Sequence, residues 1–261
     1  LKPEAFLRRK TVHEILADKG VKSYCVTRSF YRNTALSRML QKSAALETYM
    51  NSPDLCIIIR KLLEAESDAK TGIFAYWDMV DMMAHMYGPS AEEVSAELRN
   101  LTYSLKTELL DKLDHRAAKG SVLIITGDHG QSDVSKDRCI MVSNHPRLLD
   151  DLSIPPTGDS RAAFLHVKPG RVEDAMNYMK KRFRGKVDIL ESEEALRNGL
   201  LGIGLPKRSV KDRIGDLIVL PRENYAFTYP YKLRQREFTL KGVHGGLSED
   251  EVLVPFICLR L

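Results

Sequence analysis

The sequence contains no long uninterrupted apolar run. Of its 261 residues, 43% are hydrophobic and 29% are charged, an ordinary balance for a globular protein. No stretch approaches the ~20 consecutive apolar residues of a membrane-spanning helix. The chain also does not open on the basic and apolar pattern of a signal peptide. We therefore expect no membrane partner and a cytoplasmic location.

Cysteine is scarce and forms no sequence motif. The four cysteines are far apart, include no C-x-x-C pair and lie in apolar surroundings: Cys25, Cys56, Cys139 and Cys258. Free thiols in such surroundings are typical of the core of an intracellular protein. We expect reduced, buried thiols.

A strong charge of either sign is also missing. The chain has 40 Lys and Arg against 35 Asp and Glu, a net charge of +5. Its densest basic run, at 180–184, lies at the end of an expected helix, where cations complement the helix dipole. This argues against duplex nucleic acid as a partner, whereas a mildly basic protein suits small anionic substrates. The glycine-rich stretch 199–204 lacks the G-K-[ST] ending of a phosphate-binding loop.

Short apolar runs alternate with amphipathic helical patterns along the chain. The order strand, loop, helix, strand over 72–127 predicts a βαβ crossover with parallel strands, whose carboxyl ends share one edge of a sheet. The predicted fold class is α/β, a mostly parallel sheet with helices on both faces. The main expected elements are strands at 21–27, 72–77 and 121–127 and helices at 4–19, 54–66 and from 89 to about 119, with irregular structure at 29–50.

We expect one catalytic domain over 1–261 with a smaller lobe inserted at 155–212. The lobe is predicted from a turn signal at 155–159 and the strand–helix–strand pattern that follows it. The apolar run at 216–220 would then return the chain to the main fold. Because the chain begins at Leu1, directly before a helical pattern, we also expect the domain to be N-terminally truncated.

The stretch 121–130, SVLIITGDHG, carries the first candidate site. A buried strand of a parallel sheet would end at Gly127, and ligands bind at the carboxyl ends of such strands. Asp128 and His129 follow there between two glycines, where a sharp turn can present both side chains. A solvent-exposed turn is the alternative, but charged groups at this position are seldom there for stability.

A second pair, Asp81 and His85, follows the strand at 72–77. Their spacing of four places both on one face of a helical turn, within reach of one metal ion. A chance hydrogen bond between the two on a loop is the alternative, and Asp78 competes for the role of the aspartate.

His244 lies in Gly-Val-His-Gly-Gly, where glycines allow close approach to a metal or a phosphate. A flexible surface loop is the alternative. Ser248 and Glu251 fit a capping box, so the acidic residues after the loop are expected to be structural. Arg161 could contact a substrate anion, but an ordinary salt-bridged arginine is the favoured interpretation.

Three histidines and two aspartates at strand ends are more ligands than one tetrahedral structural site takes, and they suit two neighbouring ions. The sequence also resembles the alkaline phosphatase superfamily, in particular its type I phosphodiesterase and nucleotide pyrophosphatase branch. The resemblance extends from about residue 70 to the C-terminus with the order of the motifs kept. It is carried by YWDMVDMMAHMYGP, TGDHG and HGGLSEDEVLVP.

The resemblance implies a metal-dependent hydrolase of small phosphate esters or nucleotides. Asp81, His85 and His244 would hold one divalent ion, and Asp128 and His129 would help to hold a second. Zinc is the expected metal, with manganese as the alternative.

The family completes its site with an upstream aspartate and a Ser or Thr nucleophile at the start of a helix, and here the sequence departs from the pattern. We therefore expect the nucleophile to lie outside this chain, which leaves the catalytic residue unassigned. The chain alone should then bind about one ion well but hydrolyse phosphodiesters poorly. The upstream hydroxyls that lack the expected setting are Thr27, Ser29, Thr34 and Ser37.

Several other functions remain open. Sibling families on the same fold act on sulfate esters, phosphonates or phosphosugars, and a non-catalytic metal-binding relative would also lack the nucleophile. A mononuclear iron oxygenase could use Asp81, His85 and His244, but such enzymes are usually all-β and this reading leaves Asp128 and His129 without a role. Nothing in the sequence specifies an oligomeric state.

Overall fold

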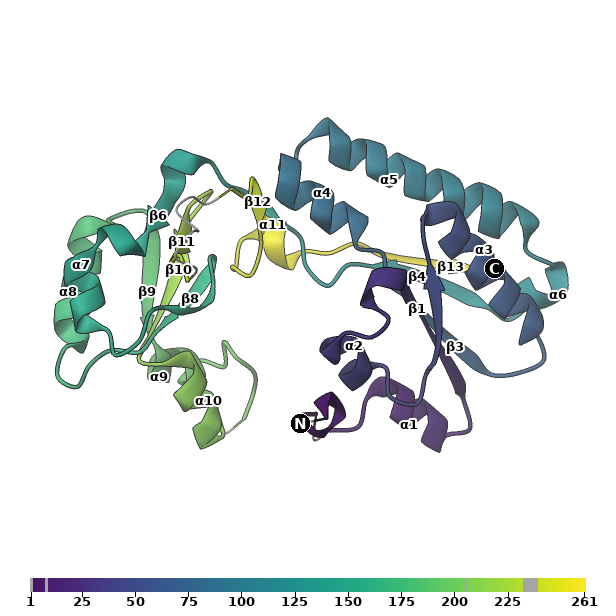
Figure 1. Ribbon diagram of the computed structural model, residues 1–261, viewed down its shortest axis with the longest axis horizontal. Coiled ribbons are helices and arrows are strands. Elements are labelled where there is room, and N and C mark those ends of the chain that lie inside the picture. The colour runs from purple at the N-terminus through teal and green to yellow at the C-terminus, as the bar shows by residue number, and fades with distance from the viewer. Residues whose placement is uncertain (1, 8, 205, 232–238) are drawn as a thin grey trace. The chain divides into compact units, whose positions relative to one another are not determined.

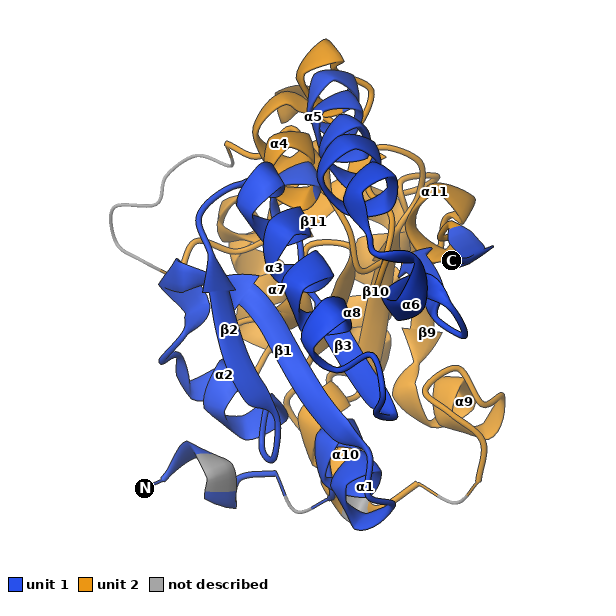
Figure 2. Cartoon of the chain, turned by 90° about the vertical axis from the view of Figure 1, so that its right-hand side faces the viewer, with its two compact units in different colours: residues 1–80, 95–125, 256–261 blue, residues 81–94, 126–255 orange. Residues whose placement is uncertain are grey.

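The computed structural model describes all residues except 1, 8, 205 and 232–238 (Figure 1). The chain divides into two compact units (Figure 2). Unit 1 comprises Leu1–Val80, Ser95–Ile125 and Phe256–Leu261, and unit 2 comprises Asp81–Val94 and Thr126–Pro255.

Unit 1 is built on a three-stranded parallel sheet with the strand order β2-β1-β3. The central strand β1 (Lys22–Arg28) pairs with β2 (Ala45–Tyr49) and β3 (Thr71–Ala75), so the carboxyl ends of all three strands share one edge. The strands predicted at 21–27 and 72–77 are confirmed. Strand β2 lies within the stretch that was expected to be irregular.

Helix α3 (Ser52–Ala65) packs on this sheet, and its apolar face supplies much of the core of unit 1. Leu55, Cys56 and Ile59 lie on one face of the helix and belong to the same core cluster as Val26 of β1. Asn51 caps the helix by accepting a hydrogen bond from the Asp54 N–H (3.0 Å). Two shorter helices, α1 (Val12–Asp18) and α2 (Ala35–Leu40), complete this part of the unit.

The long helix expected over 89–119 is interrupted. Helix α5 (Glu92–Ser104) continues into a π-helical segment (Leu105–Leu109) and a 3₁₀ turn (Leu110–Lys112) before α6 (His115–Ala118). Arg60 of α3 donates to the Glu108 carbonyl oxygen (3.0 Å) within the π-helical segment. The irregular turn is therefore stabilised by a neighbour that is distant in sequence.

Strand β4 (Val122–Thr126) pairs with the last strand, β13 (Phe256–Arg260). Among the described residues, β3 pairs with β1 and not with β4, so the parallel pairing predicted by the βαβ pattern is not observed. The mixed α/β class is confirmed. The sheets are smaller than expected and only partly parallel.

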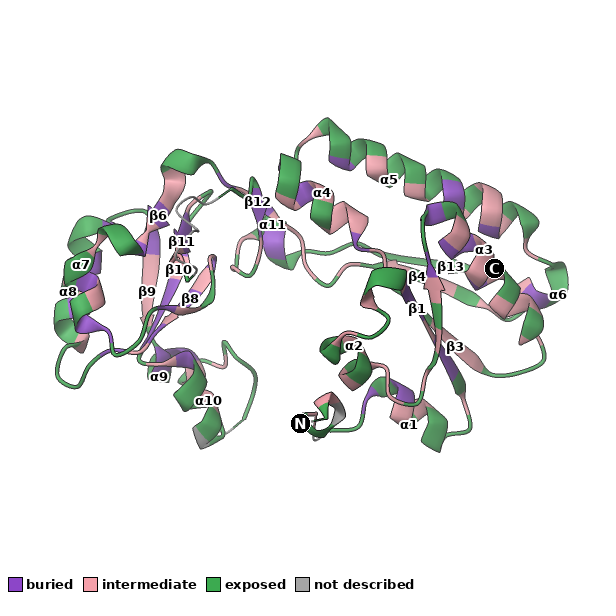
Figure 3. Cartoon of the chain, viewed as in Figure 1, coloured by how far each residue is buried: buried purple, intermediate pink, exposed green. Residues whose placement is uncertain are grey.

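Unit 2 contains a four-stranded antiparallel sheet with the order β7-β8-β10-β9. Strand β10 was expected to return to the main fold, but it pairs with β8 and β9, because its apolar side chains complete this core. Figure 3 shows β10 buried and β13 exposed. The strands are β7 (Thr157–Asp159), β8 (Ala162–Leu165), β9 (Val187–Glu191) and β10 (Leu217–Pro221), and the accompanying helices are α7 (Pro146–Asp151), α8 (Val172–Arg182), α9 (Ser192–Arg197) and α10 (Arg208–Ile214).

Two further strand pairs belong to unit 2. Strand β11 (Ala226–Thr228) runs parallel to β6 (Cys139–Met141), and β12 (Gly242–Val243) runs antiparallel to β5 (Ser132–Asp133). Helix α4 (Met79–Tyr87) and helix α11 (Glu249–Val252) flank the β12–β5 pair in sequence and carry groups discussed below. No helix of the described residues is long and apolar enough to cross a membrane.

The cysteines are free, as expected, but not all are buried. Cys56 is buried and Cys25 and Cys139 are partly buried, whereas Cys258 is exposed. The expectation of four core thiols was wrong for Cys258, because every side chain of β13 is exposed.

Candidate metal centre

Three predicted ligands lie together in unit 2. Asp81 and His85 are on α4, and His244 directly follows β12. One ligand atom from each residue lies within 4.8 Å of the others. The Asp81 Oδ1 and His85 Nε2 atoms are 3.4 Å apart, and the rings of His85 and His244 have centroids 5.2 Å apart. Among the described residues, this is the one group of three or more potential ligands that is close enough to hold an ion.

The helix α4 accounts for the first two of these ligands. Side chains four residues apart lie on one face of a helix, which brings Asp81 and His85 together without any distant contact. The competing aspartate, Asp78, is buried in unit 1. Its Oδ2 atom accepts hydrogen bonds from Arg28 (3.2 Å) and Tyr31 (2.9 Å), so it serves a different contact.

Strand β12 fixes the orientation of the His85 ring. The His85 Nδ1–H donates to the Gly242 carbonyl oxygen (2.8 Å), which leaves Nε2 as the free nitrogen that faces Asp81. The backbone of β12 also approaches α4 closely, because the Lys241 N–H donates to the His85 carbonyl oxygen (2.9 Å). Such a second partner on a histidine is typical of metal ligands, since it sets the tautomer and the ring direction.

Gln131 orients the aspartate. Its side-chain amide donates to Asp81 Oδ1 and to the Asp81 carbonyl oxygen (3.1 Å). Sequence reasoning missed this residue, because only the pairing of β5 with β12 brings the segment after His129 beside α4. No local pattern around Gln131 could have indicated the contact.

His129 contacts the cluster by ring stacking. Its ring lies 3.6 Å from that of His244, nearly parallel to it at 15°. The His129 Nδ1–H donates to the Gly130 carbonyl oxygen (3.0 Å), and Nε2 is 3.7 Å from Asp128 Oδ2. Asp128 is exposed, and it is not part of the three-residue group. The structure therefore brings His129 to the cluster and leaves Asp128 at its edge.

The surroundings of His244 favour its neutral form. Partial burial lowers the pKa of the imidazole, and the neighbouring His129 lowers it further. The carboxylates of Asp81 and Asp159 act in the opposite direction but do not reverse the shift. A neutral imidazole is the form that binds a metal.

These donors fit a divalent cation. Two histidines and one carboxylate with free, converging ligand atoms are a common set for zinc, with further positions left for water or substrate. The fit is poorer for a second ion, because Asp128 and His129 supply only two donors between them.

The upstream hydroxyls occupy structural positions in unit 1. Thr27 is buried, and Ser29 lies in a 3₁₀ turn. Thr34 is the N-cap of α2, where it accepts a hydrogen bond from the Ser37 N–H (3.2 Å). The expectation that none of these residues begins a helix was therefore wrong for Thr34.

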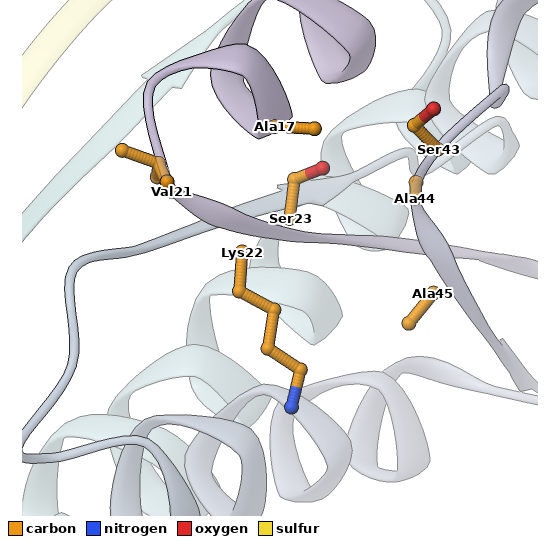
Figure 4. A pocket seen from close by; sticks show the side chains of 8 residues that line it. Ala17, Val21, Lys22, Ser23, Ser43, Ala44 and Ala45 are labelled. Atoms are coloured by element: carbon orange, nitrogen blue, oxygen red, sulfur yellow. The ribbon is translucent and has the colours of Figure 1, made fainter.

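A groove in unit 1 lies away from the carboxyl ends of the strands. It has a volume of about 560 Å³ and is lined by residues around the amino ends of β1 and β2, among them Lys22, Ser23 and Ala45 (Figure 4). Ligands of parallel sheets bind at the opposite ends of the strands, and the groove carries no metal-ligating group.

The family of the chain follows from a direct match. Residues 10–247 match the family model for type I phosphodiesterase / nucleotide pyrophosphatase. The chain belongs to this family. The match covers most of the sequence and confirms the resemblance that the three motifs carried.

Solved structures support the same fold. The chain is similar to human ectonucleotide pyrophosphatase / phosphodiesterase 5 (18% identity, TM-score 0.62) and to its murine counterpart (15%, 0.64), covering 95% of this chain and 63% of either protein. It is also similar to phosphonoacetate hydrolase from Sinorhizobium meliloti 1021 in complex with phosphonoacetate (21%, 0.68), covering 99% of this chain and 70% of that one. At these identities the likeness is one of fold, and the chain spans about two thirds of the length of these proteins.

Proposed function

We propose that this protein is a metal-dependent hydrolase of phosphate esters, of the phosphodiesterase / nucleotide pyrophosphatase type. The observation that carries the proposal is the cluster of Asp81, His85 and His244, whose ligand atoms lie within 4.8 Å of one another in a chain of this family. Its substrate would be a small phosphate ester or nucleotide.

The residues present suggest how the site would work. Asp81, His85 and His244 would hold one divalent ion, zinc or else manganese, and Asp128 and His129 would contribute to a second. When bound, such ions would stabilise the charge on the phosphate oxygens and lower the pKa of the attacking group. Gly242 and Gln131 hold the ligands in place through the hydrogen bonds described above. We assign no nucleophile to a residue of this chain.

A zinc titration tests the metal site. We expect about one ion to bind tightly to the parent protein. His244→Ala should weaken binding at least ~10-fold, because it removes one of three protein ligands. His115→Ala is the matched control, since His115 is an exposed histidine of α6 outside the cluster. Equal zinc affinity in the parent and in His244→Ala would contradict the proposed ligand set.

Phosphonate hydrolysis is the second candidate function. It is favoured by the likeness to phosphonoacetate hydrolase over 99% of the chain, with a TM-score of 0.68. Nitrophenyl phosphodiesters, nucleotides and phosphonoacetate should be compared at equal zinc concentration, with His244→Ala as the blank. Zinc-dependent turnover of one class identifies the substrate. Tight zinc binding without turnover of any of them would agree both with the lack of an assigned nucleophile in this chain and with a non-catalytic relative.

A further inference from the structure

A buried ion pair lies beside the candidate metal centre and outside its ligand set. Arg161 donates from Nε to Glu251 Oε1 (3.0 Å) and from Nη2 to Glu251 Oε2 (2.8 Å). Only 1% of either side chain is exposed. This two-bond geometry fixes the relative orientation of the guanidinium and the carboxylate.

Glu251 contacts the loops that carry two of the histidines. Its Oε1 atom accepts a hydrogen bond from the Gly246 N–H (2.9 Å), two residues after His244. Its main-chain carbonyl oxygen accepts one from the Gly130 N–H (2.9 Å), directly after His129. One residue of α11 is therefore hydrogen-bonded to the segments that hold both stacked rings.

Both loops approach α11 closely at a glycine. A Cβ atom at Gly246 would lie 2.7 Å from Glu251 Oε2, and one at Gly130 would collide with the Asp250 carbonyl oxygen. The Ser248 hydroxyl donates to the same Oε2 atom (2.6 Å), which adds another bond to the carboxylate. A displacement of Glu251 would thus be transmitted directly to the two loops.

Arg161 connects this contact to the antiparallel sheet. It lies between β7 and β8, and its Nη1 donates to the Tyr225 carbonyl oxygen. Burying two charges carries a desolvation penalty, so a pair of this kind adds little stability compared with apolar packing. Its hydrogen bonds instead join the sheet, the helix α11 and the histidine loops.

We infer that Arg161 and Glu251 are positioning residues that hold His129 and His244 in the geometry for metal binding. The inference rests on the proposed function, since it concerns the same metal. It gives the antiparallel sheet a role at the site, because the sheet places the guanidinium that fixes Glu251.

Zinc affinity of the folded variants is the first test. We expect Glu251→Gln to weaken zinc binding ~10-fold, the lower end of the effect of losing a ligand's own outer partner. Its carboxylate bonds the backbone beside His244 and not the ring itself. Ser248→Ala keeps the ion pair and should give a smaller loss, which provides a second variant if Glu251→Gln does not fold. Asp151→Asn is the matched control, because Asp151 is a fully buried carboxylate paired with Arg171 in the same unit (2.5 Å).

Thermal unfolding in the presence of a chelator shows whether a loss of zinc affinity follows from misplaced histidines or from a general loss of stability. Asp151→Asn should lower the unfolding temperature about as much as Glu251→Gln yet leave zinc affinity unchanged. Equal loss of affinity in both variants would overturn the inference, and so would unchanged affinity in Glu251→Gln.

Imidazole NMR signals of the metal-free protein provide a readout that needs no zinc. Glu251→Gln should move the signals of His129 and His244 and leave that of His13 in place. A parent protein that binds neither zinc nor manganese would refute the proposed function. The positioning role would then be decided by these signals. Unchanged signals of both rings would refute it.

Discussion

Gly242 accepts a hydrogen bond from His85, and its Cα packs against Ala84 and Gln131. Replacing it with alanine therefore tests this packing. An added Cβ would lie 2.6 Å from Gln131 Oε1 and closer still to the Ala84 carbonyl oxygen, whereas real Cβ atoms essentially never come within 3.0 Å of another heavy atom. Strand β12 must therefore move away from α4 by ~0.5 Å or more, because packed interiors leave no free space.

That movement would reach the ligands. The hydrogen bond from His85 Nδ1 to the Gly242 carbonyl oxygen is 2.8 Å long, and a shift of ~0.5 Å would stretch it beyond the usual limit of about 3.2 Å. His85 would lose its fixed orientation, and His244, two residues further on, would move with the strand. We expect Gly242→Ala to weaken zinc binding ~10-fold or more and to lower the free energy of unfolding by ~1–3 kcal/mol.

Zinc titration against a competing chelator, combined with urea unfolding, measures both effects. Gly170→Ala is the matched control, because Gly170 has a positive φ of 78° and open space around it. It should cost ~1–2 kcal/mol through backbone strain alone and leave zinc affinity unchanged. If Gly242→Ala bound zinc as tightly as the parent and unfolded at the same urea concentration, the close packing of β12 on α4 would be refuted.

Three further outcomes are expected. Asp128→Asn should leave affinity for the first zinc ion and stability within ~0.5 kcal/mol of the parent, because its side chain is 72% exposed and lies outside the three-residue group; a large loss of the first ion, measured by titration, would contradict this. Maleimide should modify Cys258 first in the native protein at pH 8, since burial raises the pKa of the Cys56 and Cys139 thiols to about 11; mass spectrometry of digests would show a different order if the exposure of β13 is wrong. Burial raises the pKa of the Glu251 carboxyl, but its hydrogen bonds outweigh burial, and the net pKa lies below the ordinary value. The contribution of this carboxylate to stability is therefore present above about pH 4.3 and is lost as the pH falls through the lowered pKa. The stability difference between the parent and Glu251→Gln should shrink in acid, and a constant difference in urea unfolding down to pH 3 would contradict the shift.

The sequence predicted those parts of the site that depend on local geometry. Asp81 and His85 could be paired from their spacing alone, because a helical turn brings residues i and i+4 together. His244 could be selected from its flanking glycines, and the backbone around it does pack closely against neighbouring groups. That these residues bind a metal stays a prediction, as does the lobe at 155–212.

The predictions that failed concern residues whose structure depends on pairing with distant segments. The polar alternation of β2, ALETY, gave no clear strand signal, and its parallel partner lies some twenty residues upstream. The run that forms β10 is apolar on both faces, so its sequence could not distinguish a strand of the main sheet from one of the antiparallel sheet. Gln131 was missed for the same reason, since its contact to Asp81 exists only because β5 pairs with β12.

The capping box expected at 248–251 shows how a distant contact can override a local pattern. Ser248 is the N-cap of α11, but its hydroxyl makes no capping bond to the helix backbone and donates to the Glu251 carboxylate. Arg161 holds that carboxylate from a strand connection 90 residues earlier. A buried guanidinium with two bonds competes strongly for a carboxylate, and no local pattern includes it.

The three candidate ligands therefore differ in which contacts hold them in the metal-free protein. Asp81 and His85 are fixed by a helix, Gly242 and Gln131, whereas His244 lies in a loop that is held at one end by β12 and at the other by Glu251. Because these contacts already order the ligands in the metal-free protein, an ion has little further conformational entropy to remove on binding. Metal binding should then stabilise the native state by simple mass action, about 2.7 kcal/mol at a free zinc concentration 100 times the Kd. If the loop instead became ordered only with the ion, zinc affinity would depend on the flexibility of residues 244–246. The hydrogen bond from the Gly246 N–H to the Glu251 carboxylate argues against that arrangement.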